Sequence, residues 1–197
     1  MIYHNVDFMN ENSVIESNSI DLIISSPPID ILTQRSYTLF NIFEQIVKSD
    51  GWILVDVPAE LGLRYRVSSP AESIGRSIIH SYFVSHAYPN GFNQYIYAIH
   101  AEPSDPVDGN LPINRERDAS HECEFCPTMI QNLIERYSEP GDTVLDPFCG
   151  TGTVPGVANE IGRVGVGCDL RPKENVLSQY RRMKDVKDGH TYNKGEL

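Results

Sequence analysis

A loop with two glycines is the first segment whose residue types suggest chemistry. It lies between an expected strand and an expected helix, and its residues are Asp146, Pro147, Phe148, Cys149, Gly150, Thr151, Gly152 and Thr153. Gly150 and Gly152 permit a tight turn that a ligand can approach closely, and the N–H groups that open the helix favour an anionic group there. Asp169, at the end of the next expected strand, can accept two hydrogen bonds from a ribose diol. These residues predict a site for a nucleoside-containing cofactor.

The residues around this loop also discriminate between cofactors. A dinucleotide-binding loop of the form G-x-G-x-x-G has a third glycine, but this chain has Pro155 at that position. The Asp146 carboxylate would repel a pyrophosphate and could hold the ammonium group of an amino acid moiety. We therefore expect S-adenosylmethionine (SAM) as the cofactor.

A second loop, Ser25-Ser26-Pro27-Pro28, follows the apolar run from Ile20 to Ile24. A proline pair that ends a strand is most often only a terminator. At the carboxyl end of a strand beside a cofactor, however, prolines hold the loop extended and present carbonyl oxygens as acceptors. Hydrogen bonds from a conjugated amine to the Ser26 hydroxyl and the Pro27 carbonyl would favour a more tetrahedral, more nucleophilic nitrogen.

These two loops and their order resemble the amino-group DNA methyltransferases of the permuted, β-type order, in which the S/D-P-P-Y catalytic motif precedes the cofactor motif. Ser26, Pro27 and Pro28 match the catalytic motif, residues 146–153 match the SAM loop and Asp169 matches the ribose-binding acid. The run from His121 to Pro127 resembles the H-x-x-x-F-x-P stretch that leads into the helix before the SAM loop. Phe125 in that run is expected to pack near SAM.

The resemblance implies a SAM-dependent methyltransferase of α/β class with a Rossmann-like fold, a mostly parallel seven-stranded sheet and helices on both faces. It implies DNA as the partner, with the target base flipped into the pocket, in DNA methylation of the restriction-modification kind. RNA guanine methyltransferases that share the D-P-F-C-G-T-G loop place it before their Pro-Pro motif, so the order here favours DNA. Ser26 together with Phe125-x-Pro127 looks more like cytosine-N4 than adenine-N6 enzymes.

One residue departs from the family pattern. Ile29 stands where the family has an aromatic residue that would stack on the flipped base, and such stacking is worth about 1–3 kcal/mol. Tyr37 or Phe40 could substitute from the next helix. Ile29 therefore also motivates an alternative: a SAM-binding, catalytically weakened subunit that regulates or completes a partner methyltransferase. Methylation of RNA or of a protein amine is a third, weaker alternative.

The elements that must position these loops are expected to alternate between strand and helix. Strands are expected at Ile20 to Ile24, Trp52 to Val57, Tyr82 to Tyr88, Tyr95 to His100, Thr143 to Leu145 and Val164 to Cys168. Helices are expected over Leu39 to Val47, Ala71 to His80, Met129 to Tyr137 and Thr151 to Ile161. The strands around Pro89-Asn90-Gly91 read as a hairpin, and Ala101 to Glu124 read as a loop. Such alternation predicts a parallel sheet covered on both faces.

The charge balance argues against tight, unspecific binding of nucleic acid. The chain has 16 Lys+Arg and 27 Asp+Glu, which gives a net charge of −11, whereas such binders usually carry a basic footprint. Phosphate contacts could instead come from the basic stretch between Arg171 and Lys187 or from a partner chain, which could be a second copy of this one. The separate arginines that could serve are Arg35, Arg64, Arg66 and Arg76.

Length and composition fit one domain over residues 1–197, with a short variable, target-recognition-like segment at about 58–120. Residues Met1 to Ser13 do not read as a signal peptide, and no apolar run approaches the roughly 20 residues that span a bilayer. Cys123-x-x-Cys126 beside His121 could be half of a zinc site, but no second pair follows at suitable spacing, so we expect no metal. Together with the four cysteines, taken as reduced thiols, these features lead us to expect a cytoplasmic protein without a membrane partner.

Overall fold

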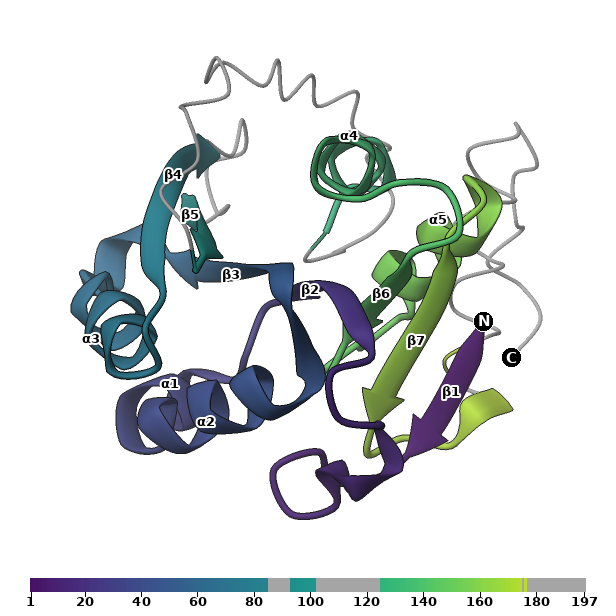
Figure 1. Cartoon of the computed structure of the whole chain (residues 1–197), viewed down its shortest axis with the longest axis horizontal. Helices are drawn as coiled ribbons and strands as arrows, with labels where there is room; N and C mark the ends of the chain where they lie inside the picture. Colours follow the sequence, from purple (N-terminus) through teal and green to yellow (C-terminus); the bar gives the residue numbers. More distant parts are fainter. Residues whose placement is uncertain (85–92, 102–124, 175, 177–197) are drawn as a thin grey trace, which may run out of the picture.

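The computed structural model describes residues 1–84, 93–101, 125–174 and 176, and its central feature is a seven-stranded sheet (Figure 1). The strand order is β1-β7-β6-β2-β3-β5-β4. The strands are β1 (Ile2–Asn5), β2 (Ile20–Ser25), β3 (Val47–Pro58), β4 (Ser77–Val84), β5 (Gln94–His100), β6 (Thr143–Asp146) and β7 (Val164–Asp169). The strands from β1 to β3 in this order run parallel, whereas β5 is antiparallel to both β3 and β4. The expected mostly parallel, seven-stranded sheet is thus present.

Helices cover both faces of this sheet, as Figure 1 shows. The α-helices are α1 (Ile29–Gln34), α2 (Ser36–Ile46), α3 (Tyr65–Ser73), α4 (Pro127–Tyr137) and α5 (Thr153–Glu160). Two short 3-10 helices, η1 (Asn12–Val14) and η2 (Ala59–Leu61), lie in the connections. Within the described ranges, no helix combines the length and the apolar character that crossing a bilayer requires.

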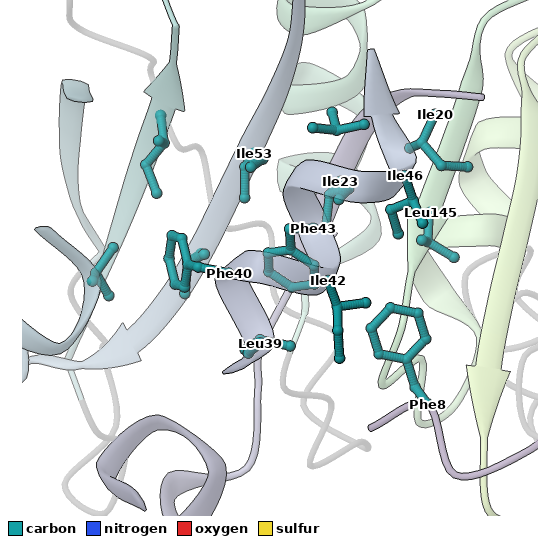
Figure 2. Packing of buried hydrophobic residues seen from close by; sticks show 14 of the residues in the cluster. Phe8, Ile20, Ile23, Leu39, Phe40, Ile42, Phe43, Ile46, Ile53 and Leu145 are labelled. Atoms are coloured by element: carbon teal, nitrogen blue, oxygen red, sulfur yellow. The ribbon is translucent and has the colours of Figure 1, made fainter. Parts of the chain in front are cut away.

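The first face of the sheet packs against α1, α2 and α3. Figure 2 shows Phe40 and Phe43 of α2 lying against the strand residues Ile23 and Ile53. The Phe40 and Phe43 rings are 5.7 Å apart and both are fully buried. Burial of side chains of this size is worth about 1.5–3 kcal/mol each. This packing therefore holds α2 firmly against β2, the strand from which the Ser26-Pro27-Pro28 loop departs.

The second face packs against α4 and α5. Leu22 and Leu54 contribute from the strands, while Ile130 of α4 and Val154 of α5 contribute from the helices. Successive residues of a strand point to opposite faces. Leu54 therefore faces α4 and α5, whereas Val55 belongs to the cluster on the other face. Asp56 lies two residues after Leu54 and shares its face.

Most of the expected elements agree with the structure, but the boundary between α3 and β4 does not. The helix expected over Ala71 to His80 is wrong: α3 ends at Ser73 and β4 begins at Ser77. Gly75 has a φ of +77°, which glycine adopts readily, and this ends the helix despite the helical spacing of the isoleucines around it. The β4 and β5 strands form the expected antiparallel pair, although the Pro89-Asn90-Gly91 connection lies outside the described residues.

Ser49, Asp50 and Gly51 follow the expected helix and are residues typical of a turn that ends a helix, but the structure has them within β3. Their strand segment is irregular: Ile20 pairs with Val47, but Leu22 pairs with Trp52. A Cβ at Gly51 would lie 2.7 Å from Cγ2 of Val47 and 2.9 Å from the Asp21 carbonyl oxygen. The chain therefore needs glycine where β3 approaches β2 this closely.

Arg76, considered above as a phosphate contact, is only 1% exposed, and its side chain has a structural role. Its Nε donates to Glu44 at 2.5 Å, and its other nitrogens donate to the carbonyls of Gly51 and Lys48 at 2.8 and 3.0 Å. A buried guanidinium with these partners anchors the start of β4 beside the α2–β3 junction. It is not available to a phosphate.

Candidate functional site

The site predicted from sequence lies at the edge of the sheet where the parallel strands end. The chain leaves β6 through α5 to β7 on one side, and leaves β2 through α1 and α2 to β3 on the other. The strand order therefore reverses between the neighbours β6 and β2. In open α/β sheets, ligands bind in the crevice outside the carboxyl ends of the strands at such a point.

The Ser26-Pro27-Pro28 loop begins directly after β2 at this edge. Pro27 is buried, Ser26 is partly buried and Pro28 is exposed. Pro28 precedes the first helical residue of α1, Ile29, and its φ of −52° and ψ of 141° keep the loop extended. The structure thus has the extended loop that the prolines predict, turning into a short helix that the sequence reading missed.

The Ser26 hydroxyl is held by the neighbouring strand. Its Oγ donates to Oδ2 of Asp56 at 3.1 Å, and Nε2 of Gln94 donates to the same oxygen at 2.8 Å. Asp56 is only 2% exposed. Because Ser26 gives its hydrogen to Asp56, the lone pairs of its oxygen remain to accept hydrogen bonds from another group.

The glycine loop follows β6, next to β2. Gly150 and Gly152 have φ values of +52° and +81°, a region that favours glycine. Asp146 is buried and its Oδ1 accepts from the N–H of Phe148 at 3.1 Å. Gly152 is the N-cap of α5 and supplies no side-chain cap, so the N–H groups of the first turn can meet an external anionic group.

The other predicted residues of this loop have mainly packing contacts. Phe148 is partly buried, and its ring meets that of Phe8 edge to face at 5.9 Å. Pro147 and Thr153 are buried, and the Thr151 and Thr153 hydroxyls are 3.1 Å apart. Phe148 therefore packs against the core on the α2 side of the sheet, and this packing stabilises the glycine loop.

Asp169 lies at the end of β7, as predicted, and joins the two parts of the candidate cofactor site. Its Oδ2 accepts from the N–H of Gly150 at 2.9 Å. Its Oδ1 accepts from both the backbone N–H and Nε of Arg171 at 3.0 Å. Burial alone would raise the pKa of this carboxyl, but the hydrogen bonds from Arg171 and Gly150 lower it overall. Asp169 is therefore an ionised acceptor whose present partners include Arg171.

Strand β1 fixes the turn that follows Asp169. The Tyr3 hydroxyl donates to the Arg171 carbonyl, and the N–H of Val6 donates to the Asp169 carbonyl at 3.1 Å. The side-chain amide of Asn5 reaches the same Asp169 oxygen, also at 3.1 Å. Burial is the main cause that raises the pKa of Tyr3 to about 12. Tyr3 thus stays a neutral donor, and the position of Asp169 depends on the first strand of the chain.

Helix α5 lies unusually close to β7 because two strand residues have no side chain. A Cβ on Gly165 would lie 2.7 Å from the Pro155 carbonyl carbon, and one on Gly167 would lie 3.2 Å from Cγ of Pro155. Pro155, the residue that replaces the third glycine of a dinucleotide loop, is thus packed against β7. This close contact fixes the start of α5 and with it the glycine loop.

The two cysteines beside the loop are buried thiols. Cys149 is 5% exposed and Cys168 is fully buried. Burial raises the pKa of both, that of Cys168 to about 12. Both are neutral at physiological pH, and a thiol in that state is a poor nucleophile. They serve as small apolar residues.

The other residues singled out from the sequence differ in their exposure. Phe125 is buried in the cluster with α4 and α5, on the sheet face that Asp56 shares. Ile29 is 50% exposed at the start of α1, and Tyr37 is 52% exposed on α2. Phe40 cannot stack on a base, because it is fully buried behind the sheet. His121, Cys123 and most of the basic stretch that starts at Arg171 lie outside the described residues.

Sequence reasoning missed Asp56 and Gln94, and it named Arg171 only as the start of the basic stretch and not as a partner of Asp169. Asp56 had a usable signal, since it is the single charge in the apolar run from Trp52 to Val57. A carboxylate in a buried strand is rare unless it has hydrogen-bond partners. Gln94 and Arg171 had no comparable signal, because each is one polar residue among others next to a strand end.

Comparison with known proteins gives a consistent result. Residues 100–178 match a family model described as DNA methylase. The chain is 34% identical over 79 residues to the Type II methyltransferase M.BglII of Bacillus subtilis, which covers 40% of this chain and 22% of that protein. It is 42% identical over 62 residues to the Type II methyltransferase M.XycI of Xanthomonas campestris pv. cyanopsidis, covering 32% and 21%. The matched part thus spans about a fifth of the length of these relatives.

Solved structures share the fold over nearly the whole chain. The PvuII DNA methyltransferase (cytosine-N4-specific) matches with a TM-score of 0.73 and 16% identity, over 99% of this chain and 87% of that one. The M1.HpyAVI–SAM complex matches with a TM-score of 0.67 and 14% identity, over 91% and 99%. The expected Rossmann-like fold is confirmed.

Proposed function

We propose that this chain, whose residues 100–178 belong to the DNA methylase family, transfers a methyl group from SAM to an exocyclic amine of a DNA base. The observation that carries the proposal is the position of the two loops. The Ser26-Pro27-Pro28 loop and the glycine loop follow the neighbouring strands β2 and β6 at the point where the strand order reverses. An amine and a methyl donor bound by these loops would meet in one crevice.

SAM fits the donors and acceptors that the glycine loop offers. Asp169 would accept from the ribose hydroxyls, sharing or replacing its present contact with Arg171. The uncapped start of α5 would receive the carboxylate of the methionine moiety, and Asp146 would lie near its ammonium group. The remaining residues assigned to the SAM site are Phe125, Pro147, Phe148, Gly150, Thr151, Gly152 and Thr153. The bound cofactor would supply a sulfonium methyl group as the electrophile.

Ser26 and Pro27 would prepare the amine. Conjugation with the base ring delocalises the nitrogen lone pair, which makes the amine a poor nucleophile. Hydrogen bonds from its two hydrogens to Oγ of Ser26 and the Pro27 carbonyl would favour a tetrahedral nitrogen. Because Ser26 already donates to Asp56 at 3.1 Å, its oxygen is fixed as an acceptor and is made more electron-rich by the carboxylate. Pro28 keeps the loop extended.

The same contacts offer a route for the proton that must leave. As the nitrogen bonds to the methyl carbon, the carbon–sulfur bond breaks and its electron pair remains on sulfur. The nitrogen then carries one proton too many. Ser26 would accept that proton while its own hydrogen passes to Asp56, so the hydroxyl is restored and the negative charge of Asp56 is neutralised. Gln94 donates to the same carboxylate oxygen at 2.8 Å and would keep it oriented.

Cytosine-N4 is the preferred target, with adenine-N6 second. The serine at the head of the catalytic loop and the Phe125-x-Pro127 spacing support this order. The similarity in fold to a cytosine-N4-specific enzyme agrees with it. The target base would be flipped out of the duplex, and a Type II restriction-modification role would follow the names of the relatives.

One observation favours a second candidate function. Ile29, at the position of the family's aromatic residue, is half-exposed and offers no ring to a base. This favours a SAM-binding, catalytically weakened chain that regulates or completes a partner methyltransferase. A purified chain that methylates DNA over many turnovers without a partner would contradict this alternative.

Radiolabelled SAM and mixed-sequence DNA test the first proposal. We expect label in the DNA, and mass spectrometry of the digested DNA should identify N4-methylcytosine rather than N6-methyladenine. Ser26→Ala should lower transfer at least tenfold and leave SAM affinity unchanged. Ser19→Ala, at the opposite end of β2, should change neither the transfer rate nor the SAM affinity. Calorimetry should show SAM binding by the wild-type chain and about tenfold weaker binding by Asp169→Asn. SAM binding without any transfer to DNA would overturn the enzymatic proposal.

A further inference from the structure

The start of α3 carries two arginines and a tyrosine: Arg64 is its N-cap, and Tyr65 and Arg66 are its first two residues. Tyr65 is 56% exposed. The guanidinium carbon of Arg66 lies 4.9 Å from the centre of the Tyr65 ring, and that of Arg64 lies 5.9 Å from the centre of the Tyr97 ring. The segment therefore presents an exposed ring with a cation on it and a second cation beside it.

These two arginines differ from others that the structure describes. Arg76 pairs with Glu44, Arg171 pairs with Asp169, and Arg163 donates to Ser138 and Ile161. Within the described part of the chain, neither Arg64 nor Arg66 has a carboxylate partner, and Nε of Arg66 is buried without a hydrogen bond. Between Glu60 and Glu72 the sequence contains these two arginines and no acidic residue. In a chain of net charge −11, this is a local site of positive charge.

The segment lies close to the catalytic loop in the fold. It follows the end of β3 that carries Asp56, the partner of Ser26. Helix α3 packs against α1, and α1 begins directly after Pro28. The three helices on this side of the sheet lie together in Figure 1. Two further apolar side chains on neighbouring elements, Leu61 of η2 and Ile29 of α1, are about half-exposed.

We propose that Arg64, Tyr65 and Arg66 form a contact surface for the DNA strand next to the target base, an inference that rests on the proposed function. The arginines would bind backbone phosphates and Tyr65 would stack on an unpaired base. Cations that follow a backbone beside an exposed ring are the combination that holds unstacked nucleotides. The surface would give a chain of acidic composition the phosphate contacts that its overall charge opposes.

The salt dependence of DNA binding tests the arginines. Fluorescence anisotropy with a labelled duplex should be recorded between 50 and 200 mM salt, with SAM present. Each phosphate contact contributes about 0.9 to the slope of log affinity against log salt, so Arg64→Gln with Arg66→Gln should lower the slope by about 2. Arg64→Lys with Arg66→Lys keeps both charges and should keep most of the slope.

Tyr65 is tested by a pair of variants. Tyr65→Ala should weaken DNA binding about tenfold, since stacking on an aromatic ring is worth about that factor or more. Tyr65→Phe keeps the ring and should bind like the wild type. Neither change should alter the affinity for SAM, which calorimetry measures on the same preparations.

The outcomes separate this inference from the proposed function. If the double glutamine variant keeps the wild-type salt slope and still methylates DNA, the proposed contact surface is wrong. The proposed methyltransferase activity would then still stand. A reduced slope in a chain that binds DNA and SAM but transfers no methyl group would support the surface and overturn the proposed activity. Stronger binding of single-stranded RNA than of DNA by the wild type, lost in the same variants, would overturn DNA as the occupant.

Discussion

Ser26 donates a hydrogen bond to Asp56 across the neighbouring strands β2 and β3, with 3.1 Å between the two oxygens. The hydroxyl lies in a partly exposed loop, whereas the carboxylate is 2% exposed and at the end of a buried strand. A reactive loop is thereby connected to the rigid interior. This contact sets the direction of the serine lone pairs, which the loop alone could not do.

The first prediction concerns Asp56. Asp56→Asn keeps the size of the side chain but removes the charge that would receive the proton through Ser26. We expect the single-turnover rate of methyl transfer to fall about 100-fold, in the usual range for the loss of a general base. The affinity for SAM should be unchanged.

Asp50→Asn is the matched control, because Asp50 is an exposed acid on the same strand β3. It should transfer methyl groups at the wild-type rate. Equal rates for Asp56→Asn and the wild type would show that Asp56 only supports the fold and takes no part in the proton route.

The second prediction concerns Ile29, which is 50% exposed directly after the proline pair. Ile29→Tyr supplies the ring that the family pattern has there, and base stacking is worth about 1–3 kcal/mol. We expect the KM for DNA to fall at least fivefold in steady-state assays. Val14→Tyr adds a ring at another exposed position and should leave the KM unchanged. A rise in the KM of Ile29→Tyr would mean that this position does not face the base.

The third prediction concerns the pH dependence of stability. His80 is only 8% exposed, and its ring stacks on Trp52 with 6.1 Å between the ring centres. Its Nε2 has no hydrogen bond among the described residues. Burial, and then the charge of Arg136, lower its pKa below the ordinary value of about 6.5. The folded state therefore prefers neutral His80, and its contribution to stability is present above pH 6.5 and is lost as the pH falls through the lowered pKa.

Urea unfolding at pH 7.5 and pH 5.5 measures this effect. The wild type should lose more free energy of unfolding between these two values than His80→Gln, which has no imidazole to protonate. The difference between the two proteins isolates His80 from the other titrating groups. Equal losses would contradict the expected pKa shift.

The fourth prediction tests the contact between α5 and β7. In Gly165→Ala the new methyl group would lie against the Pro155 carbonyl, 2.7 Å from its carbon, and backbone cannot move aside cheaply. We expect a loss of about 3 kcal/mol in the free energy of unfolding. Gly141→Ala, where φ is +97° and no atom lies within 4 Å of the new Cβ, should lose only about 1–2 kcal/mol from backbone strain. A smaller loss for Gly165→Ala than for Gly141→Ala would contradict the close packing.

The parts of the fold with strong local patterns were predictable from the sequence. The apolar run before Ser25 gave β2, the stripe from Met129 to Tyr137 gave α4, and the glycine loop marked the boundary between β6 and α5. These patterns persist because one side of each element is buried, and burial imposes a period on the sequence. The positions of Asp146 and Asp169 at strand ends follow from the same patterns.

The rest depended on contacts between distant residues. Strand β1 has four residues and only partial burial, so its short sequence has no strong pattern, and it exists because it pairs with β7. Isoleucines at 74, 78 and 79 have helical spacing, but the left-handed conformation of Gly75 decides the outcome. The partnership of Ser26, Asp56 and Gln94 joins three strands that neighbour one another only in the folded sheet.

The anchoring of Asp169 by β1 has a practical consequence for work with this protein. Tyr3, Asn5 and Val6 hold the turn after β7 through hydrogen bonds, so the first six residues are part of the wall of the candidate ribose site. A substitution at Tyr3 or Asn5 would remove one of these hydrogen bonds. Such a variant would therefore act on the candidate cofactor site through the position of Asp169, although neither residue belongs to the glycine loop.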